Sequence, residues 1–363
     1  MIKNKDFKLF TFIIILIPVL IIGCSDGNVI KRINGGGGSG TIITTSTISQ
    51  TISEQSILQS AYVKSVLSTL YNPDSIAENG AIGRNKNGFS DVAAQRGAVF
   101  IILRGIAENN QNTIDKGIKA IEYGFQFQEA DGHFSNGHGL TALEAISADA
   151  FFIQAVGHAA LAVKQSPYND VFSPRFNALS DEIGLSLNWL NQNKNELISQ
   201  DNGVPNRLLF DANAFILNGI FLNRNDLIAI GKKFANAALD LQRDDGVFIE
   251  NNGHDSSYQA TSILNLEFLW LYTDDTQLKN RAYTSLNKAV EWEKTRINAE
   301  TGEVSVEGNT RTGSCQELFL GECKMVSYPE VINALIYWYA IANDGNARIL
   351  AYKAMNYALT YLV

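Results

Sequence analysis

With 363 residues, the chain is longer than a typical single domain, but a large helical domain of about 300 residues remains possible. Apolar residues make up 45% of the chain and only 6 residues are proline, which favours a helix-rich globular protein. Because the formal net charge is −8 and no Lys/Arg block occurs beyond the N-terminus, nucleic acid is not an expected partner. An acidic protein can still bind an acidic glycan through a locally basic cleft.

The N-terminal segment combines positive charge with a short apolar run. Lys3, Lys5 and Lys8 precede or border the run, which covers 9–22. The run is too short and wrongly flanked for a typical membrane-spanning helix, so a cleaved signal peptide is expected. An uncleaved anchor helix is the alternative.

The end of this run, Ile21-Ile22-Gly23-Cys24, resembles the lipobox of a bacterial lipoprotein signal. The resemblance implies that 1–23 is a signal peptide and that Cys24 carries a lipid. The mature protein would then be anchored in the cell envelope through this lipid alone, and Ser25 favours the outer membrane. The segment 24–48, with its run of glycines, is expected to be a flexible linker.

From about Ser49 onward the pattern is helical, with apolar residues spaced three and four apart. Some of the expected helices are apolar nearly all round and fit an inner layer, whereas others have one polar face and fit an outer layer. Helices are expected near 50–71, 90–108, 112–128, 141–165, 175–196, 208–222, 225–242, 256–273, 276–297, 327–343 and 345–362.

A weak internal repeat supports this alternation. Asp131-Gly132-His133-Phe134 is echoed by Asp245-Gly246-Val247-Phe248, and each motif precedes an Asn-Gly-His segment. The two motifs are 114 residues apart, about twice the length of a helical hairpin with its loops. We therefore predict an all-α domain over 49–363 that forms an α/α toroid, an incomplete six-hairpin barrel. A straight solenoid is the alternative.

Most of the histidines lie in the expected loops. His133, His138 and His254 are loop residues, whereas His158 lies within a helix and is expected in the core. In a toroid the long loops open onto the face where the inner helices begin. Helix N-termini attract anionic groups, so this face is the expected substrate-binding face.

The loop that precedes the helix near 256–273 is the richest in polar groups. Asp255-Ser256-Ser257 is typical of a helix N-cap, which places Tyr258 in the first turn, four residues after His254. Asn252 and a basic residue could neutralise the substrate's acid group, while Tyr258 acts as base and then as acid. In the alternative interpretation, Asp255 only caps, His254 stacks and Tyr258 packs.

Arginine suits a uronate carboxylate because its guanidinium binds two oxygens at once. Arg96, Arg207 and Arg311 each fall at or near the expected start of an inner helix, or in its loop. Arg311 is the preferred candidate.

Glycoside hydrolysis is a second possible reaction, because it needs two carboxylic groups on opposite sides of one bond. Asp131, Asp245, Asp255 and Glu330 are candidates, although Asp-Gly is also a common turn dipeptide. Other loop residues are expected to bind the substrate. The substrate-binding candidates are His138, His133, Asn136, Asp131, Phe248, Tyr328 and Glu330.

Two cysteines remain once Cys24 is assigned to the lipid. Cys315 and Cys323 lie eight residues apart with no histidine nearby, so in an oxidising compartment we expect a disulfide rather than a metal site. Motifs for phosphate loops, zinc proteases and serine hydrolases are absent from the sequence. The sequence therefore predicts neither a cofactor nor a metal.

The helical repeat, the Asp-Gly-x-Phe turns and the segment from Asn252 to Tyr258 resemble the α/α-toroid carbohydrate-active enzymes, particularly polysaccharide lyases. The resemblance implies a neutralising Asn or His, a Tyr base and an Arg, and Asn252, His254, Tyr258 and Arg311 match these types. The chain lacks the β-sandwich domain that many toroid lyases carry. The first hypothesis is a lipid-anchored lyase that cleaves a uronic-acid-containing polysaccharide by β-elimination. The alternatives are a glycoside hydrolase and a non-catalytic glycan-binding surface lipoprotein.

Overall fold

The computed structural model describes residues 52–362, except for His138, Ser314, Gln316, Leu320 and Gly321. These residues belong to the unit Gln50–Val363, one of two compact units in the chain. The segments expected to form the signal peptide, 1–23, and the lipidated linker, 24–48, belong to the other unit, Met1–Ser49, and lie outside the described residues.

The all-α class is confirmed, because the described regular structure is almost entirely helical. A single hairpin of two-residue strands, β1 (Leu318–Phe319) and β2 (Glu322–Cys323), interrupts the helices, together with three short 3-10 helices, η1 (Pro73–Ser75), η2 (Gly83–Asn87) and η3 (Val92–Gly97). The α-helices are α1 (Glu54–Leu58), α2 (Ala61–Leu70), α3 (Ala98–Glu108), α4 (Gln111–Phe125), α5 (Ile146–Gln165), α6 (Asn169–Ala178), α7 (Ser180–Gln192), α8 (Lys194–Asp201), α9 (Pro205–Phe221), α10 (Asn225–Asp240), α11 (Ser256–Tyr272), α12 (Thr276–Thr295), α13 (Tyr328–Ala342) and α14 (Gly345–Tyr361).

Most expected helices occur within a few residues of their predicted ends, but three segments differ. The segment 90–108 begins as the 3-10 helix η3 and becomes α-helical only at Ala98. The segment 50–71 contains two helices, α1 and α2. The region around 175–196 is divided into α6, α7 and α8, with breaks at Leu179 and Asn193. The apolar residues keep their helical spacing across these breaks, so the periodicity of the sequence alone did not reveal them.

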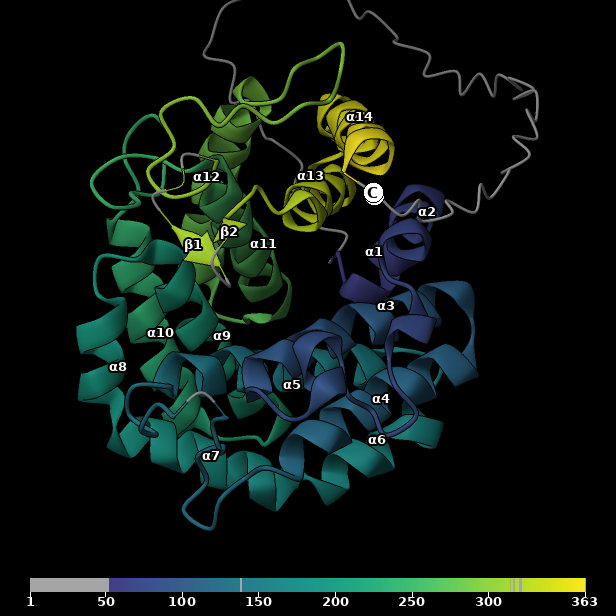
Figure 1. Ribbon diagram of the computed structural model, residues 1–363, viewed down its shortest axis with the longest axis vertical. Helices are drawn as coiled ribbons and strands as arrows, with labels where there is room; N and C mark the ends of the chain where they lie inside the picture. The colour runs from purple at the N-terminus through teal and green to yellow at the C-terminus, as the bar shows by residue number, and fades with distance from the viewer. Residues whose placement is uncertain (1–51, 138, 314, 316, 320–321, 363) are drawn as a thin grey trace, which may run out of the picture. The chain divides into compact units, whose positions relative to one another are not determined.

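The longer helices form two layers of contacts. Four pairs are consecutive in the chain and pack on each other: α3 with α4, α9 with α10, α11 with α12, and α13 with α14. One helix of each pair (α3, α9, α11 and α13) also belongs to a second series of contacts, together with α2 and α5. In this series each helix contacts the next in the order α2, α3, α5, α9, α11, α13, and α13 contacts α2 (Figure 1). Among the described helices, α5 is long and apolar enough to span a membrane, but 83% of its apolar window is buried inside the protein.

The Asp-Gly turns of the repeat adopt the same structure at both positions. Gly132 and Gly246 have φ values of 102° and 93°, which favour glycine. A Cβ atom at Gly246 would collide with the carbonyl of Lys288 in α12, and one at Gly132 would collide with that of Leu185 in α7. The expectation that these motifs are turns required by the repeat is therefore confirmed.

Two further expectations about single residues are also confirmed. His158 is fully buried, and its Nε2 atom lies 2.8 Å from both carboxylate oxygens of Glu54 in α1. Cys315 and Cys323 form a disulfide that closes the loop containing β1 and β2.

Candidate functional site

A polar cavity of about 450 Å³ lies where α9, α11 and α13 begin. Its wall also includes residues of η3, α5 and the loop around the disulfide. The lining residues are Arg96, Phe151, Asn206, Arg207, Phe210, Ser257, Tyr258, Thr261, Arg311, Glu317, Glu322, Cys323, Lys324, Met325, Ser327 and Glu330.

The start of α11 is fixed by Asp255, as the sequence predicts. Its carboxylate accepts hydrogen bonds from the backbone N–H groups of Ser257 and Tyr258 at 3.1 and 3.3 Å. The same carboxylate accepts the backbone N–H groups of Arg311 and Thr312 at 3.0 and 2.7 Å. Asp255 therefore caps the helix and also fastens the loop that brings Arg311 to Tyr258.

The phenol of Tyr258 is enclosed by charged groups. Its hydroxyl donates a hydrogen bond to Glu317 Oε2 at 2.6 Å, and the Lys324 ammonium donates to the same phenolic oxygen. The guanidinium carbon of Arg311 lies 4.0 Å from the centre of the Tyr258 ring, a cation–π contact. Tyr258 is thus held between an acceptor and a donor of protons.

Arg311 is occupied by two carboxylates. Its Nη1 atom lies 2.6 Å from Glu250 Oε1, and its Nη2 and Nε atoms each lie 3.0 Å from an oxygen of Glu317. Burial would lower the pKa of Arg311, but the hydrogen bond to Glu250, the charges of Tyr258 and Glu250 and the contact with Glu317 raise it. Arg311 is therefore a fixed cation that orients Glu317 and the Tyr258 ring.

The pKa values of the neighbouring acids follow from burial and from these contacts. Burial, followed by the hydrogen bond to Glu317, raises the pKa of the Tyr258 phenol well above its usual value. Burial also raises the pKa of Glu250 despite the opposing effect of Arg311. For Glu317, burial is outweighed by the Tyr258 hydrogen bond and by Lys324 and Arg311, so its pKa is lowered. At neutral pH Tyr258 is protonated and Glu317 is ionised.

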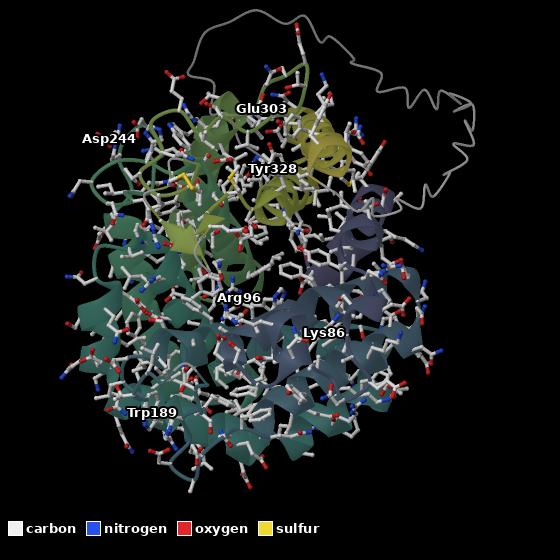
Figure 2. The ribbon with its side chains drawn as sticks, viewed as in Figure 1. Lys86, Arg96, Trp189, Asp244, Glu303 and Tyr328 are labelled. Carbon is white, nitrogen blue, oxygen red and sulfur yellow. A yellow bond between two sulfur atoms is a disulfide. The ribbon has the colours of Figure 1, made fainter. Side chains whose placement is uncertain are left out.

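The other two arginines predicted for substrate binding also line the cavity. Arg207 pairs with Asp201, with its Nη1 atom 3.1 Å from Oδ1. Arg96 makes no ion pair with any described residue, and its guanidinium lies 5.7 Å from the ring centre of Phe151 and 5.8 Å from that of Phe210. Figure 2 shows Arg96 near the middle of the unit. Arg96 is therefore the cavity cation best able to pair with an added anion.

Glu330 is the remaining predicted residue in the cavity wall. It lies in the first turn of α13, and its Oε2 atom accepts a hydrogen bond from Thr261 Oγ1 at 2.9 Å. The cavity therefore contains five of the residues that the sequence offered as candidates: Tyr258, Arg311, Glu330, Arg96 and Arg207.

His254 and Asn252 do not line the cavity. The His254 ring packs on Trp292 with centres 5.3 Å apart, and its Nε2 atom lies 3.2 Å from the carbonyl of Glu307. Asn252 is exposed in a tight turn with φ of 64°. These contacts match the alternative in which His254 stacks, and no contact places either residue beside Tyr258.

The remaining substrate-binding candidates also lie outside the cavity wall. Phe248 is a core residue, and Tyr328 is buried with its hydroxyl accepting the backbone N–H of Val304 at 3.0 Å. His133 and Asp131 contact each other within their own turn, with Nδ1 and Oδ1 2.5 Å apart.

Two residues of the first repeat motif complete the set. Asn136 is half-buried outside the cavity wall, and His138 lies outside the described residues. The described parts of the chain contain no group of three His, Cys, Asp or Glu side chains that could hold a metal ion.

Several cavity residues were not identified as candidates from the sequence. Glu317 lies within the loop closed by the disulfide, Lys324 directly follows Cys323, and both contact Tyr258. The predicted disulfide marked this loop as ordered, and it was the only sequence signal pointing to them. For Phe151 and Phe210 the sequence pattern indicated only helical core residues.

Comparison of the chain with family models, curated proteins and solved structures found no match.

Proposed function

We propose that the chain is a polysaccharide lyase that cleaves a uronic-acid-containing glycan by β-elimination in the cavity around Tyr258. The observation that carries the proposal is the phenol of Tyr258, which contacts Glu317 and Lys324 in a cavity where Arg96 has no carboxylate partner among the described residues. A proton-transfer group and an available cation are the two features that β-elimination beside a carboxylate requires.

The proposed roles follow from charge. Arg96 would pair with the uronate carboxylate, because a guanidinium binds carboxylates strongly and Arg311 and Arg207 already have carboxylate partners. Neutralising that carboxylate stabilises the negative charge that develops when the adjacent carbon loses its proton. Phe151 and Phe210 would offer apolar surface to the sugar ring beside Arg96.

Tyr258 would transfer the proton, with Glu317 as its partner. The protonated phenol cannot accept a proton until its own proton moves to Glu317, which already accepts that hydrogen bond. Tyr258 would take the proton from the sugar carbon as its own passes to Glu317. It would then donate a proton to the leaving glycosidic oxygen and recover one from Glu317. Lys324 and Arg311 would stabilise any negative charge on the phenol oxygen and ring.

The proposal includes an architecture and a location. We propose that the domain is an α/α toroid, which is supported by the inner contacts that run from α2 through α3, α5, α9, α11 and α13 back to α2. The lipobox-like sequence that ends at Cys24 supports a lipid-anchored protein of the cell envelope, on the outer membrane. An anionic polysaccharide or oligosaccharide is the proposed partner.

A glycoside hydrolase is the second candidate, because three carboxylic residues, Glu317, Glu322 and Glu330, line the same cavity. The lowered pKa of Glu317 keeps it ionised, which suits a nucleophile or base. The two reactions give different products, since only β-elimination creates an unsaturated sugar that absorbs ultraviolet light.

The test is a panel of uronic-acid polysaccharides, with both ultraviolet absorbance and new reducing ends recorded. We expect both signals to rise together and Tyr258→Phe to reduce the rate by about 10²–10⁴-fold. Tyr352→Phe, a tyrosine outside the cavity wall, is the matched control and should keep full activity. New reducing ends without a rise in absorbance would contradict the lyase and favour the hydrolase. If neither signal rises but the protein still binds the glycan, it is a binding protein.

A further inference from the structure

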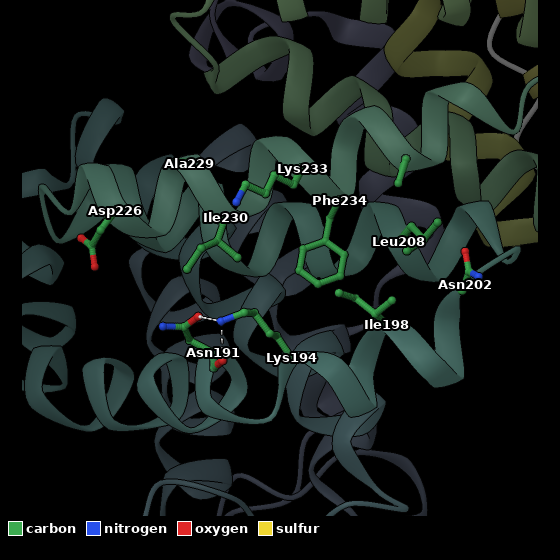
Figure 3. A pocket seen from close by; sticks show the side chains of 11 residues that line it. Asn191, Lys194, Ile198, Asn202, Leu208, Asp226, Ala229, Ile230, Lys233 and Phe234 are labelled. Carbon is green, nitrogen blue, oxygen red and sulfur yellow. Dashed lines mark hydrogen bonds between the residues drawn. The ribbon is translucent and has the colours of Figure 1, made fainter.

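A second groove, of about 580 Å³, shares no lining residue with the polar cavity. It lies between α8 and α10, and Leu208 of α9 contributes to its lining (Figure 3). Its apolar side chains are Ile198, Leu208, Ile230 and Phe234, and its polar side chains include two lysines, Lys194 and Lys233.

The groove exists because α8 is short. The side of α10 that carries Ala229, Ile230, Lys233, Phe234 and Ala237 faces the groove, with the spacing of a single helix face. A full-length outer helix could cover this face, but the chain breaks at Asn193 and continues as the eight-residue α8. Ile198 of α8 is 43% exposed, and Ala229 and Ala237 of α10 are exposed too, so apolar surface remains open on both sides of the groove, whereas Leu208 and Phe234 are buried.

The lining suits a hydrocarbon chain better than an extended peptide. Ile198, Leu208, Ile230 and Phe234 all lie within helices, whose backbone groups are paired inside the helix. A bound peptide strand would find no sheet edge with which to pair its own backbone groups. This part of the groove offers no backbone groups to a ligand, which suits a hydrocarbon chain, because such a chain needs no hydrogen bonds along its length.

The charges at the rim favour an anionic head group. Neither Lys194 nor Lys233 forms an ion pair within the described part of the chain, and the hydrogen bonds of Lys194 Nζ go to Asn191, whose Oδ1 lies 3.2 Å away. The one carboxylate in the lining, Asp226, is already paired with Arg224 at 2.5 Å. In Figure 3 the two ammonium groups lie on the side of Ile230, whereas Leu208 and Ile198 lie further along the groove.

We propose that this groove binds a long-chain fatty acid, with its hydrocarbon chain along Ile198, Leu208, Ile230 and Phe234. Its carboxylate pairs with Lys194 and Lys233. The proposal is independent of the reaction proposed for the polar cavity, because the two sites have no residue in common.

Calorimetric titration of the purified full-length protein with laurate, below the concentration at which laurate forms micelles, tests the proposal. We expect one saturable site for laurate and much weaker binding of dodecyl maltoside and dodecyl trimethylammonium, which share the chain length but not the carboxylate. Replacing both lysines, Lys194→Gln with Lys233→Gln, should weaken laurate binding about tenfold or more. Lys232→Gln is the matched control, since Lys232 pairs with Asp275 outside this groove and its replacement should leave the affinity unchanged.

A third variant separates the groove from general surface binding. Ala237 is an exposed lining residue, so Ala237→Trp should fill the groove without disturbing the core and should abolish laurate binding. Its fold is checked by circular dichroism and thermal melting. Absence of laurate binding, equal binding of the trimethylammonium analogue, or full affinity in the double lysine variant would overturn the proposal. Self-association that Ala237→Trp abolishes would assign the groove to a second copy of the chain instead.

Discussion

Replacing Glu317 by glutamine is the most informative single change at the candidate site. Glutamine keeps the shape of the side chain but removes the negative charge that accepts the Tyr258 hydroxyl at 2.6 Å. The variant also leaves Arg311 with Glu250 alone as its carboxylate partner, and Lys324 with none. The change therefore acts on the proton acceptor, while Asp255 still fastens the loop at Arg311 and Thr312.

The expected effects follow from the contacts that are lost. If Glu317 accepts the phenolic proton, its loss should lower the rate of β-elimination by about 10²–10⁴-fold. Glu317 also raises the pKa of Tyr258, whereas Arg311 lowers it, so the phenol pKa should fall in the variant. Loss of the charged hydrogen bonds should lower the free energy of unfolding by about 1–3 kcal/mol.

Three measurements check these expectations: product absorbance, ultraviolet titration of tyrosinate, and denaturant unfolding. The titration compares Glu317→Gln with the same variant carrying Tyr258→Phe, so that the signal of Tyr258 is obtained by difference. A variant with unchanged activity would refute the role of Glu317 as proton acceptor. An activity loss with an unchanged Tyr258 pKa and a large loss of stability would show a structural role only.

Two other predictions concern charge. In steady-state kinetics, Arg96→Gln should raise KM for an anionic glycan about tenfold or more, with a smaller effect on kcat. Arg96→Lys should recover part of this loss. An unchanged KM would show that Arg96 does not bind the substrate. Glu267 is fully buried in α11 without a described hydrogen-bond partner for its carboxylate, and burial raises its pKa well above the usual range. The raised pKa makes the stability depend on pH. The contribution of Glu267 to folding stability is fully present below the pKa of glutamate in the unfolded chain, about 4.3, and is lost as pH rises towards the pKa of Glu267 in the folded protein. Glu267→Gln should therefore be about 1–3 kcal/mol more stable than the natural chain at pH 8 but not at pH 4 in denaturant unfolding, and equal stabilities at pH 8 would contradict this reasoning.

Local features of the fold could be predicted because they depend on neighbouring residues. The cap at Asp255 and the start of α11 at Ser256 follow from a run of residues that favour helix N-termini. The glycine turns at Gly132 and Gly246 follow from the repeat, and Cys315 and Cys323 are close enough in the chain to pair. The breaks that divide 169–201 into three helices were missed, because their apolar spacing is continuous.

The candidate site was only partly predictable. Tyr258, Glu330 and the three arginine candidates, Arg96, Arg207 and Arg311, line the cavity as expected, but Arg311 contacts Glu250, which is 61 positions away in the chain. That contact changes the role of Arg311 from a substrate-binding residue to one that orients the site. His254 was expected beside Tyr258, yet its ring packs on Trp292.

The sequence by itself determined the helical class, the positions of most helices, the glycine turns and the placement of Tyr258 in the first turn of α11. These features depend on hydrogen bonds and steric limits within a few residues of the chain. Only the tertiary structure decided which charges neutralise one another around Tyr258, because Glu250, Arg311, Glu317 and Lys324 meet through long-range packing. It likewise decided that Arg96 has no carboxylate partner among the described residues and that a groove lies beside the short helix α8.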